Sequence, residues 1–122
     1  MIRYSDEHVW IRMEGDVGVV GITTHAQETL GDIVFVDLPA IGKLCVQHEV
    51  AGVVESVKAA ADVFAPVAGE IVEVNEQVRD NPALANTDPQ GEGWFFKMKL
   101  VSSEELNALM DEGTYVMFVQ NT

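Results

Sequence analysis

The chain has 122 residues, a formal net charge of −13 and a sequence pI near 4.3. Its length suits one domain with a single hydrophobic core, and its 48% hydrophobic content excludes a chain kept unfolded by charge. Nucleic acids and anionic membrane surfaces repel so acidic a protein, so neither is an expected partner. The expected partners are proteins with basic surface patches, because complementary charge steers association.

In the first half of the chain, the residue pattern predicts a hairpin, a short helix and a further strand. Alternating runs bounded by turn-forming residues indicate strands, and those found here are 8–13, 16–22 and 32–38. Threonine is a favoured N-cap, so Thr23 or Thr24 is expected to start a helix that ends at Leu30. Gln27 lies at capping-box distance from Thr24, and Gly31 follows the last expected helical residue.

The second half of the chain continues as short strands and ends in a helix. The strands predicted here are 50–57, 62–66, 70–75 and 94–101. Residues 80–93 are rich in Asn, Pro, Asp and Gly, so a loop with one helical turn at 82–85 is expected. Ser102 or Ser103 is expected to cap a helix running to Met110, which makes the C-terminal segment helical from about residue 102. Short strands at this spacing favour a mainly β sandwich or barrel.

The usual signatures of catalysis and metal binding are missing from the sequence. His8, His25 and His48 have no zinc-site spacing, and no nucleophile elbow, Walker loop or dinucleotide fingerprint is present. Cys45 is the single cysteine, and its apolar neighbours predict a buried side chain in a reducing compartment. No N-terminal apolar run resembles a secretory signal, so a cytoplasmic location is expected. We therefore expect neither an enzyme nor a metalloprotein.

Lys58 is the one cation between Lys43 and Arg79, in a stretch that carries several acids. These acids are Glu49, Glu55, Asp62, Glu70, Glu73 and Glu76. The predicted turn at 58–61 joins two valine-rich strands, and the alanines after Lys58 leave its amine unobstructed. A small, rigid turn that displays one amine suits an enzyme that must acylate it. Acylation would remove the charge and make the side chain a long, flexible tether.

The motif around this lysine resembles that of a known family. Glu55-Ser56-Val57-Lys58-Ala59, followed by residues 62–70, closely resembles the lipoylation segment of the glycine cleavage system H protein family. Further matches, in the family's order and spacing, are His8-Val9-Trp10, residues 21–27, 30–32 and 38–39, Asn75, Pro82, Asn86 and residues 93–99. The resemblance covers the chain from Arg3 to about Phe118.

The resemblance implies a fold and a cofactor. The fold is a lipoyl/biotinyl-domain-like sandwich of two small antiparallel sheets with short flanking helices, forming one carrier domain over residues 1–122. The cofactor is lipoate in amide linkage to Lys58, attached by a lipoate ligase or a lipoyl transferase. By the same resemblance, Glu55, Ser56, Val57 and Ala59 form the modification motif.

The resemblance also implies partners. In this family the lipoyl arm carries an aminomethyl group from the glycine decarboxylase (P protein) to the aminomethyltransferase (T protein). Dihydrolipoamide dehydrogenase (L protein) then reoxidises the arm. The chain is therefore expected to be a non-catalytic, monomeric carrier. A tether of this kind raises the effective concentration at each active site without tight binding to any of them.

Val9 departs from the family pattern, which has an acid between the His and the Trp of the first motif. In the family that acid, together with the one matching Asp62, is associated with holding the amine of the loaded arm. Glu7 lies two residues before Val9, on the same face if the strand extends that far. Glu7 and Asp62 are therefore the expected contacts of the arm amine. The alternative is that Val9 merely weakens the sequestration of the arm.

Three other functions stay open at this point. A lipoyl donor or relay for the lipoylation of 2-oxoacid dehydrogenases would use the same lysine and need not protect an aminomethyl group. A biotin carrier shares the architecture, but Val57 and Ala59 replace the methionines that usually flank its lysine. The third alternative is an unmodified binding module.

Overall fold

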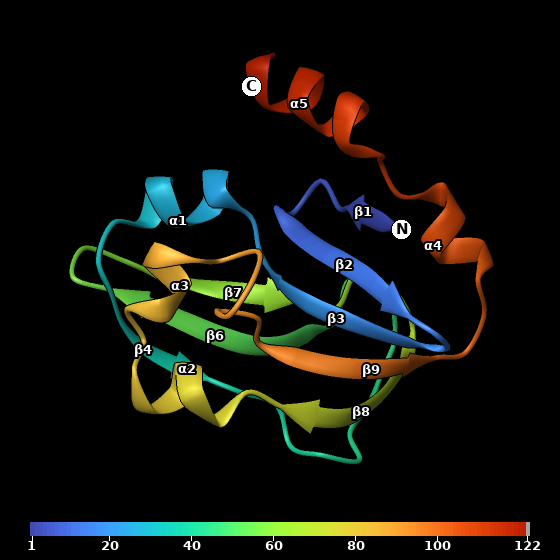
Figure 1. Cartoon of the computed structure of the whole chain (residues 1–122), viewed down its shortest axis with the longest axis horizontal. Helices are drawn as coiled ribbons and strands as arrows, with labels where there is room; N and C mark the ends of the chain where they lie inside the picture. Colours follow the sequence, from blue (N-terminus) through green and yellow to red (C-terminus); the bar gives the residue numbers. More distant parts are fainter. Residues whose placement is uncertain (122) are drawn as a thin grey trace.

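The computed structural model describes residues 1–121, which form short strands and short helices (Figure 1). The strands are β1 (Ile2–Tyr4), β2 (Val9–Glu14), β3 (Val17–Ile22), β4 (Ile33–Asp37), β5 (Leu44–Cys45), β6 (Val50–Ser56), β7 (Ala60–Phe64), β8 (Gly69–Val74) and β9 (Phe96–Leu100). The helices are α1 (Thr24–Leu30), α2 (Glu76–Asp80), α3 (Leu84–Thr87), α4 (Glu104–Ala108) and α5 (Glu112–Gln120). None of these helices has the length and apolar character that crossing a bilayer requires.

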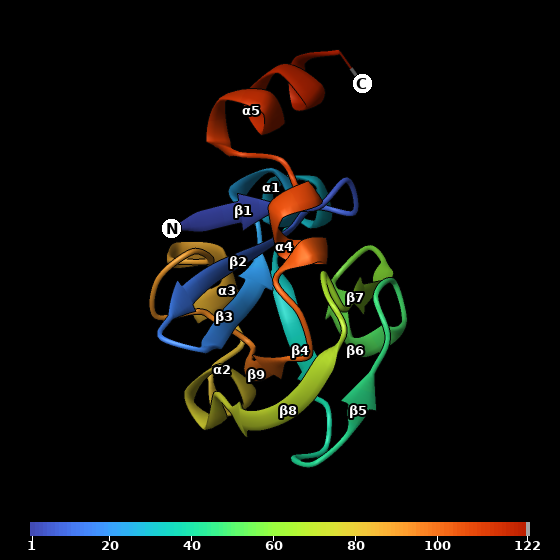
Figure 2. The same ribbon diagram turned by 90° about the vertical axis from the view of Figure 1, so that its right-hand side faces the viewer.

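The strands pair into two antiparallel sheets. The larger sheet has the order β1-β2-β3-β9-β8-β5, and the smaller one has the order β4-β6-β7. Strands β6 and β7 lie on the opposite side of the molecule from β2 and β3 (Figure 2). The prediction of a mainly β sandwich of two antiparallel sheets with short helices is confirmed.

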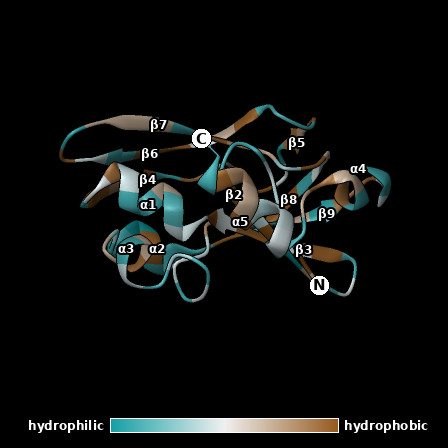
Figure 3. Ribbon diagram, turned by 90° about the horizontal axis from the view of Figure 1, so that it is seen from above, coloured by the Kyte–Doolittle hydropathy of each residue, from teal (hydrophilic) through white to brown (hydrophobic). Residues whose placement is uncertain are grey.

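Two hydrophobic clusters hold the fold together. The main core draws on both sheets, and its fully buried side chains include Ile11, Val20, Val54, Val63, Ile71, Phe96 and Met98. A smaller cluster contains Tyr4, Trp10, Val19 and Tyr115. Successive residues of a strand point to opposite faces, so Ile11 enters the main core while Trp10 enters the smaller cluster. The smaller cluster therefore anchors α5 above β1 and β2, as Figures 1 and 3 show.

The predicted hairpin and first helix are confirmed, with one change at the helix cap. Strands β2 and β3 pair from Val9↔Ile22 to Glu14↔Val17. Thr23 is the N-cap of α1, because its hydroxyl accepts the backbone N–H of Ala26 at 3.2 Å. The capping box expected from Thr24 is wrong.

The helix predicted from Ser102 or Ser103 to Met110 is present but shorter, because a backbone bridge follows it. Tyr4 and Met110 exchange two backbone hydrogen bonds, of 2.8 and 2.9 Å, so α4 ends at Ala108. A second helix, α5, starts after Asp111, whose carboxylate accepts the N–H of Thr114 at 2.9 Å. The segment is helical from about the expected position, and α5 lies beyond the end of the predicted helix.

Several short elements lie outside the prediction. The alternation rule does not find β1 or β5, because two or three residues show no period. Helix α2 ends where the loop was expected to begin, and Asn75 caps it by accepting the N–H of Gln77. Helix α3 overlaps the helical turn expected at 82–85, and β9 starts at Phe96 rather than Trp94.

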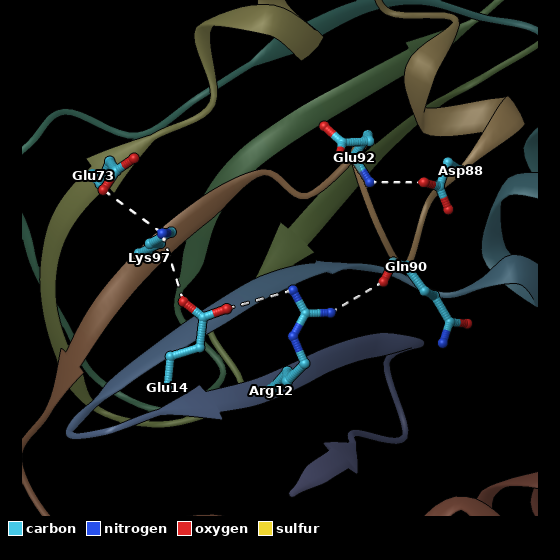
Figure 4. Close-up of polar contacts among 7 residues, drawn as sticks. All are labelled: Arg12, Glu14, Glu73, Asp88, Gln90, Glu92 and Lys97. Atoms are coloured by element: carbon cyan, nitrogen blue, oxygen red, sulfur yellow. Dashed lines mark hydrogen bonds and ion pairs between the residues drawn. The ribbon is translucent and has the colours of Figure 1, made fainter.

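Arg12 and Lys97 of the larger sheet are paired with acids on its surface (Figure 4). Lys97 on β9 lies 3.7 Å from Glu14 on β2 and 3.8 Å from Glu73 on β8. Arg12 contacts Glu14 at 3.8 Å and donates to the carbonyl of Gln90 at 3.3 Å. Exposed pairs of this kind add little stability, but they neutralise the positive charge of this sheet locally.

Candidate functional site

Lys58 lies in the tight connection between β6 and β7, which projects at one end of the molecule (Figure 1). The two strands pair up to Glu55↔Ala60, so the turn contains only the four residues 56–59. Lys58 is exposed, as are Val57 and Ala59 beside it. The predicted hairpin and the exposed position of its lysine are confirmed, although β7 starts at Ala60 rather than Asp62.

The hydroxyl of Ser56 holds this turn in place. Its Oγ accepts the backbone N–H of Ala59 at 3.1 Å and that of Lys58 at 3.3 Å, and donates to the Ala59 carbonyl at 3.1 Å. The backbone N–H of Ser56 also donates to that carbonyl, at 2.7 Å. The N–H of Val57 donates to the Asp32 carbonyl at 3.0 Å, which ties the turn to the chain just before β4. The lysine is therefore presented on a rigid backbone.

The amine of Lys58 has no ion-pair partner among residues 1–121. Its side chain extends over the end of α1, where a Cβ built on Gly31 would lie 3.6 Å from the lysine Cε. A solvated, unpaired amine on a fixed turn is open to an acylating enzyme.

A cavity of about 230 Å³ lies between α1, the start of β2 and the β6–β7 hairpin. Apolar side chains such as Val9, Leu30 and Val54 line it together with the acids Glu7 and Asp62. Leu30 precedes Gly31, so the lysine side chain runs beside the α1 edge of this cavity. The structure thus brings the two predicted arm-contact residues, which are 55 positions apart in the chain, to one cavity.

Glu7 reaches this cavity by a different route from the one expected. Strand β2 begins at Val9, and His8 has φ 63°, so the strand does not extend to Glu7 and strand alternation does not apply to it. The carboxylate Oε1 of Glu7 lies 2.8 Å from Nδ1 of His48, and this hydrogen bond raises the pKa of His48. No sequence signal pairs these two residues.

His8 and His25 also line the cavity, and they connect it to α5. Nδ1 of His8 lies 2.7 Å from the hydroxyl of Tyr115, which lies 2.8 Å from the hydroxyl of Thr23. The rings of His8 and His25 are 4.7 Å apart between centroids. Burial, followed by the neighbouring His25, lowers the pKa of His8. Sequence reasoning missed this cluster, because the segment around Tyr115 carries no motif.

The remaining candidates are a metal-ligand cluster and the thiol of Cys45. Among residues 1–121, no group of three or more His, Cys, Asp or Glu side chains is placed to hold a metal ion. Cys45 is buried, as predicted, and burial raises the pKa of its thiol. The nucleophile of interest is therefore the Lys58 amine.

Comparison with known proteins identifies the family. The family model for the glycine cleavage H-protein matches residues 2–122. The chain belongs to this family. It is 56% identical over 115 residues to the glycine cleavage system H protein of Chromobacterium violaceum, covering 93% of this chain and 90% of the relative. It is 52% identical over 118 residues to that of Thermotoga maritima, covering 97% and 95%.

A solved structure of the same family shows the same fold. The crystal structure of a glycine cleavage system H protein from Mycobacterium marinum matches with a TM-score of 0.87 at 38% sequence identity. The match covers 98% of this chain and 95% of that chain. Membership of the glycine cleavage H-protein family supports a lipoyl carrier role in the glycine cleavage system.

Proposed function

We propose that this H-protein family member carries lipoate in amide linkage on Lys58 and shuttles an aminomethyl group between the enzymes of the glycine cleavage system. The observation that supports this most is the exposed amine of Lys58, free of ion pairs within residues 1–121, on a turn fixed by Ser56. The residues present fit the group, because the lysine side chain runs beside a cavity with an apolar lining and two carboxylates.

In this proposal the P protein loads the arm with the aminomethyl group of glycine, the T protein removes it, and the L protein restores the disulfide. The bound lipoyl ring supplies the redox-active disulfide, and the chain itself performs no catalysis. The chain contributes positioning: the turn directs the tether away from the core. Tethering raises the effective concentration of the carried group at each active site.

The four neighbours of Lys58 have distinct proposed roles in its modification. Ser56 fixes the backbone of the turn, and Ala59 leaves space around the amine. Glu55 and Val57 are exposed and present a charge and an apolar surface to the lipoate ligase or lipoyl transferase. The motif therefore serves recognition as well as geometry.

We propose that Glu7 and Asp62 hold the protonated amine of the loaded arm in the cavity. Both residues line the same cavity, together with apolar side chains. A hydrogen bond between an ammonium and a carboxylate is stronger than a neutral one. Glu7 also bonds to His48, so His48 competes with the arm for this carboxylate.

A lipoyl relay for 2-oxoacid dehydrogenases is the second candidate. Val9 favours it, because an apolar, buried residue stands where the family usually places a cavity acid. The relay uses the same lysine and the same attaching chemistry, so the two candidates differ only in their clients.

Two experiments test these proposals. The intact mass of protein from the native host is expected to show a lipoyl adduct that Lys58→Arg abolishes, and an adduct that survives the substitution would refute the site. Lipoylated protein is also expected to stimulate glycine–CO₂ exchange by purified P protein. Lack of stimulation by fully lipoylated protein would reject glycine cleavage and favour the relay.

A further inference from the structure

Three large apolar side chains are exposed next to the Lys58 turn. They are Val34, Phe35 and Val57, with 54%, 50% and 71% of their surface exposed. Phe35 pairs with Glu55 across β4 and β6, and the Val57 N–H donates to the carbonyl of Asp32, just before β4. We call this group of three side chains the Phe35 patch. Apolar side chains exposed singly are ordinary, but a cluster of them beside a functional group indicates an interaction surface.

An irregularity in β4 exposes two of these residues. The register of β4 against β6 shifts between Ile33 and Phe35. Ile33 and Val36 stay buried at 4% and 2% exposure, while Val34 and Phe35 both face solvent. An extra residue in a strand re-aims its side chains, and such bulges are over-represented next to active sites and at sheet edges, where β4 lies. The core gains nothing from placing an aromatic ring outside.

The surroundings of the patch are acidic. Across the smaller sheet, Phe35 pairs with Glu55, which pairs with Ala60, and two residues further along the same face Asp37 pairs with Val53. The strands β4, β6 and β7 contain no lysine or arginine, so Lys58 is the nearest cation along this hairpin. Acylation removes that charge as well. The complementary surface is an apolar pocket for an aromatic side chain with arginine or lysine at its rim.

The position of the patch selects one partner among several. Enzymes that act on the end of a lipoyl arm place their reactive centre an arm's length from the turn. The enzyme that attaches the arm must bring its acyl donor to Nζ of Lys58, within the length of one lysine side chain. It therefore contacts the turn and the residues beside it, which include Phe35 and Val57.

We propose that the Phe35 patch is the docking site of the enzyme that acylates Lys58; this inference rests on the proposed function. In the reaction, the uncharged Nζ attacks the carbonyl carbon of an activated lipoyl donor, an acyl adenylate or a thioester. The new C–N bond forms, and the bond to the leaving AMP or thiol breaks. The proton of the attacking amine passes to a base of the enzyme. The patch provides orientation and affinity, not chemistry.

The test measures transfer of lipoate to the unmodified chain by a lipoate ligase with ATP, followed by intact mass. Phe35→Ser is expected to lower kcat/KM for the chain about tenfold, through KM, as for loss of an aromatic anchor. Phe35→Leu is expected to retain most of the wild-type kcat/KM. The matched control is Leu44→Ser, because Leu44 is 74% exposed but lies on β5 of the other sheet. Far-UV circular dichroism and thermal melting check that each variant is folded.

The outcomes separate this inference from the proposed function. If wild-type chain accepts no lipoyl group at Lys58, the proposed function fails. If wild type is modified and Phe35→Ser and Leu44→Ser have equal kcat/KM, the docking site alone is refuted. After prolonged incubation to complete modification, the lipoyl arm of Phe35→Ser is expected to be reduced by the L protein with NADH, in the reverse of its physiological direction, as fast as that of wild type. If Phe35→Ser lowered the rate of this reduction as much as it lowers lipoate transfer, the patch would be a general docking face. That result would overturn its assignment to the attaching enzyme.

Discussion

Glu7 and His48 form a hydrogen-bonded pair beside the cavity, with 2.8 Å between Oε1 and Nδ1. Glu7 lies just before β2 and His48 just before β6, so the pair joins the chain segments that lead into the two sheets. His48 is itself held at φ 71°, and its backbone N–H donates to the Ala65 carbonyl at 2.8 Å. The backbone of His48 is therefore fixed, and its imidazole contacts the carboxylate of Glu7.

The Glu7–His48 pair predicts a pH dependence. The hydrogen bond to Glu7 raises the pKa of His48, and the charges of Glu7, Asp6 and Glu105 act in the same direction. A raised folded-state pKa adds stability that is complete below the unfolded pKa and is lost as pH rises through the folded value. In an NMR titration, the pKa of His48 is expected above the ordinary 6.5 in wild type and to fall toward it in Glu7→Gln. An unchanged pKa in the variant would contradict the pairing.

The hydroxyl of Ser56 is expected to stabilise the modification turn. Ser56→Ala removes the acceptor for the N–H groups of Lys58 and Ala59, so a loss of about 1–3 kcal/mol in unfolding free energy is expected from urea titration. The matched control is Ser102→Ala, because exposed Ser102 accepts only the N–H of Glu104, and it is expected to change stability by less than about 1 kcal/mol. Equal losses in the two variants would show that the turn does not depend on Ser56.

The attachment of α5 is expected to weaken at acidic pH. His8 bonds to Tyr115 of α5 and has a lowered pKa because of burial and His25, with Asp6 acting weakly in the opposite direction. A histidine with a lowered folded pKa costs stability as pH falls through its unfolded value, since protonation favours the open state. Amide hydrogen exchange in α5 is therefore expected to accelerate between pH 7 and pH 5, after correction for the intrinsic rate.

Tyr115→Phe provides the control for that pH effect. The variant keeps the ring, which stacks on Tyr4 with 4.7 Å between centroids, but loses the hydroxyl that bonds to His8 and Thr23. Exchange in α5 is expected to be faster at pH 7 and to depend less on pH than in wild type. The same pH profile in both proteins would refute the role of His8.

The two cavity carboxylates are expected to slow loss of the aminomethyl group from the loaded arm. Glu7→Gln and Asp62→Asn each remove one charged acceptor from the cavity. A charge-assisted hydrogen bond of about 1.4 kcal/mol corresponds to an acceleration of about tenfold. The rate is followed by the mass of the loaded protein, and Glu70→Gln, at an exposed position on β8, is the control. Adduct loss at the wild-type rate in Glu7→Gln would show that Glu7 does not supply the carboxylate missing at the position of Val9.

The acidic surface is expected to make partner encounter sensitive to salt. At a net charge of −13, attraction to basic partner surfaces is long-ranged at low ionic strength and is screened as salt rises. For NADH-driven reduction of the lipoylated chain by the L protein, kcat/KM is expected to fall as salt rises from about 20 mM to about 500 mM, while kcat changes little. Rates independent of salt would contradict steering by the surface charge.

Elements with local signals were predictable, and elements that depend on distant partners were not. The β2–β3 hairpin and α1 follow from alternation, a turn and a threonine cap. Helix α5 contains glycine, threonine and valines, which are poor helix formers, so its residue pattern does not predict a helix. It forms because Asp111 caps it and Tyr115 packs against Tyr4 on β1.

The sequence by itself determined the position of Lys58, its hairpin and its exposure, because a short, valine-rich hairpin with a small-residue turn is a local structure. Tertiary structure alone decided the surroundings of that lysine. It placed Glu7 and Asp62 in one cavity, joined His8 to Tyr115 across 107 positions, and turned Phe35 outward at a bulge. These relationships depend on register, left-handed backbone at two histidines and the packing of remote segments, none of which has a local pattern. The charge pattern indicated Lys58 as the proposed attachment site, and the fold added the cavity and the exposed apolar residues around it.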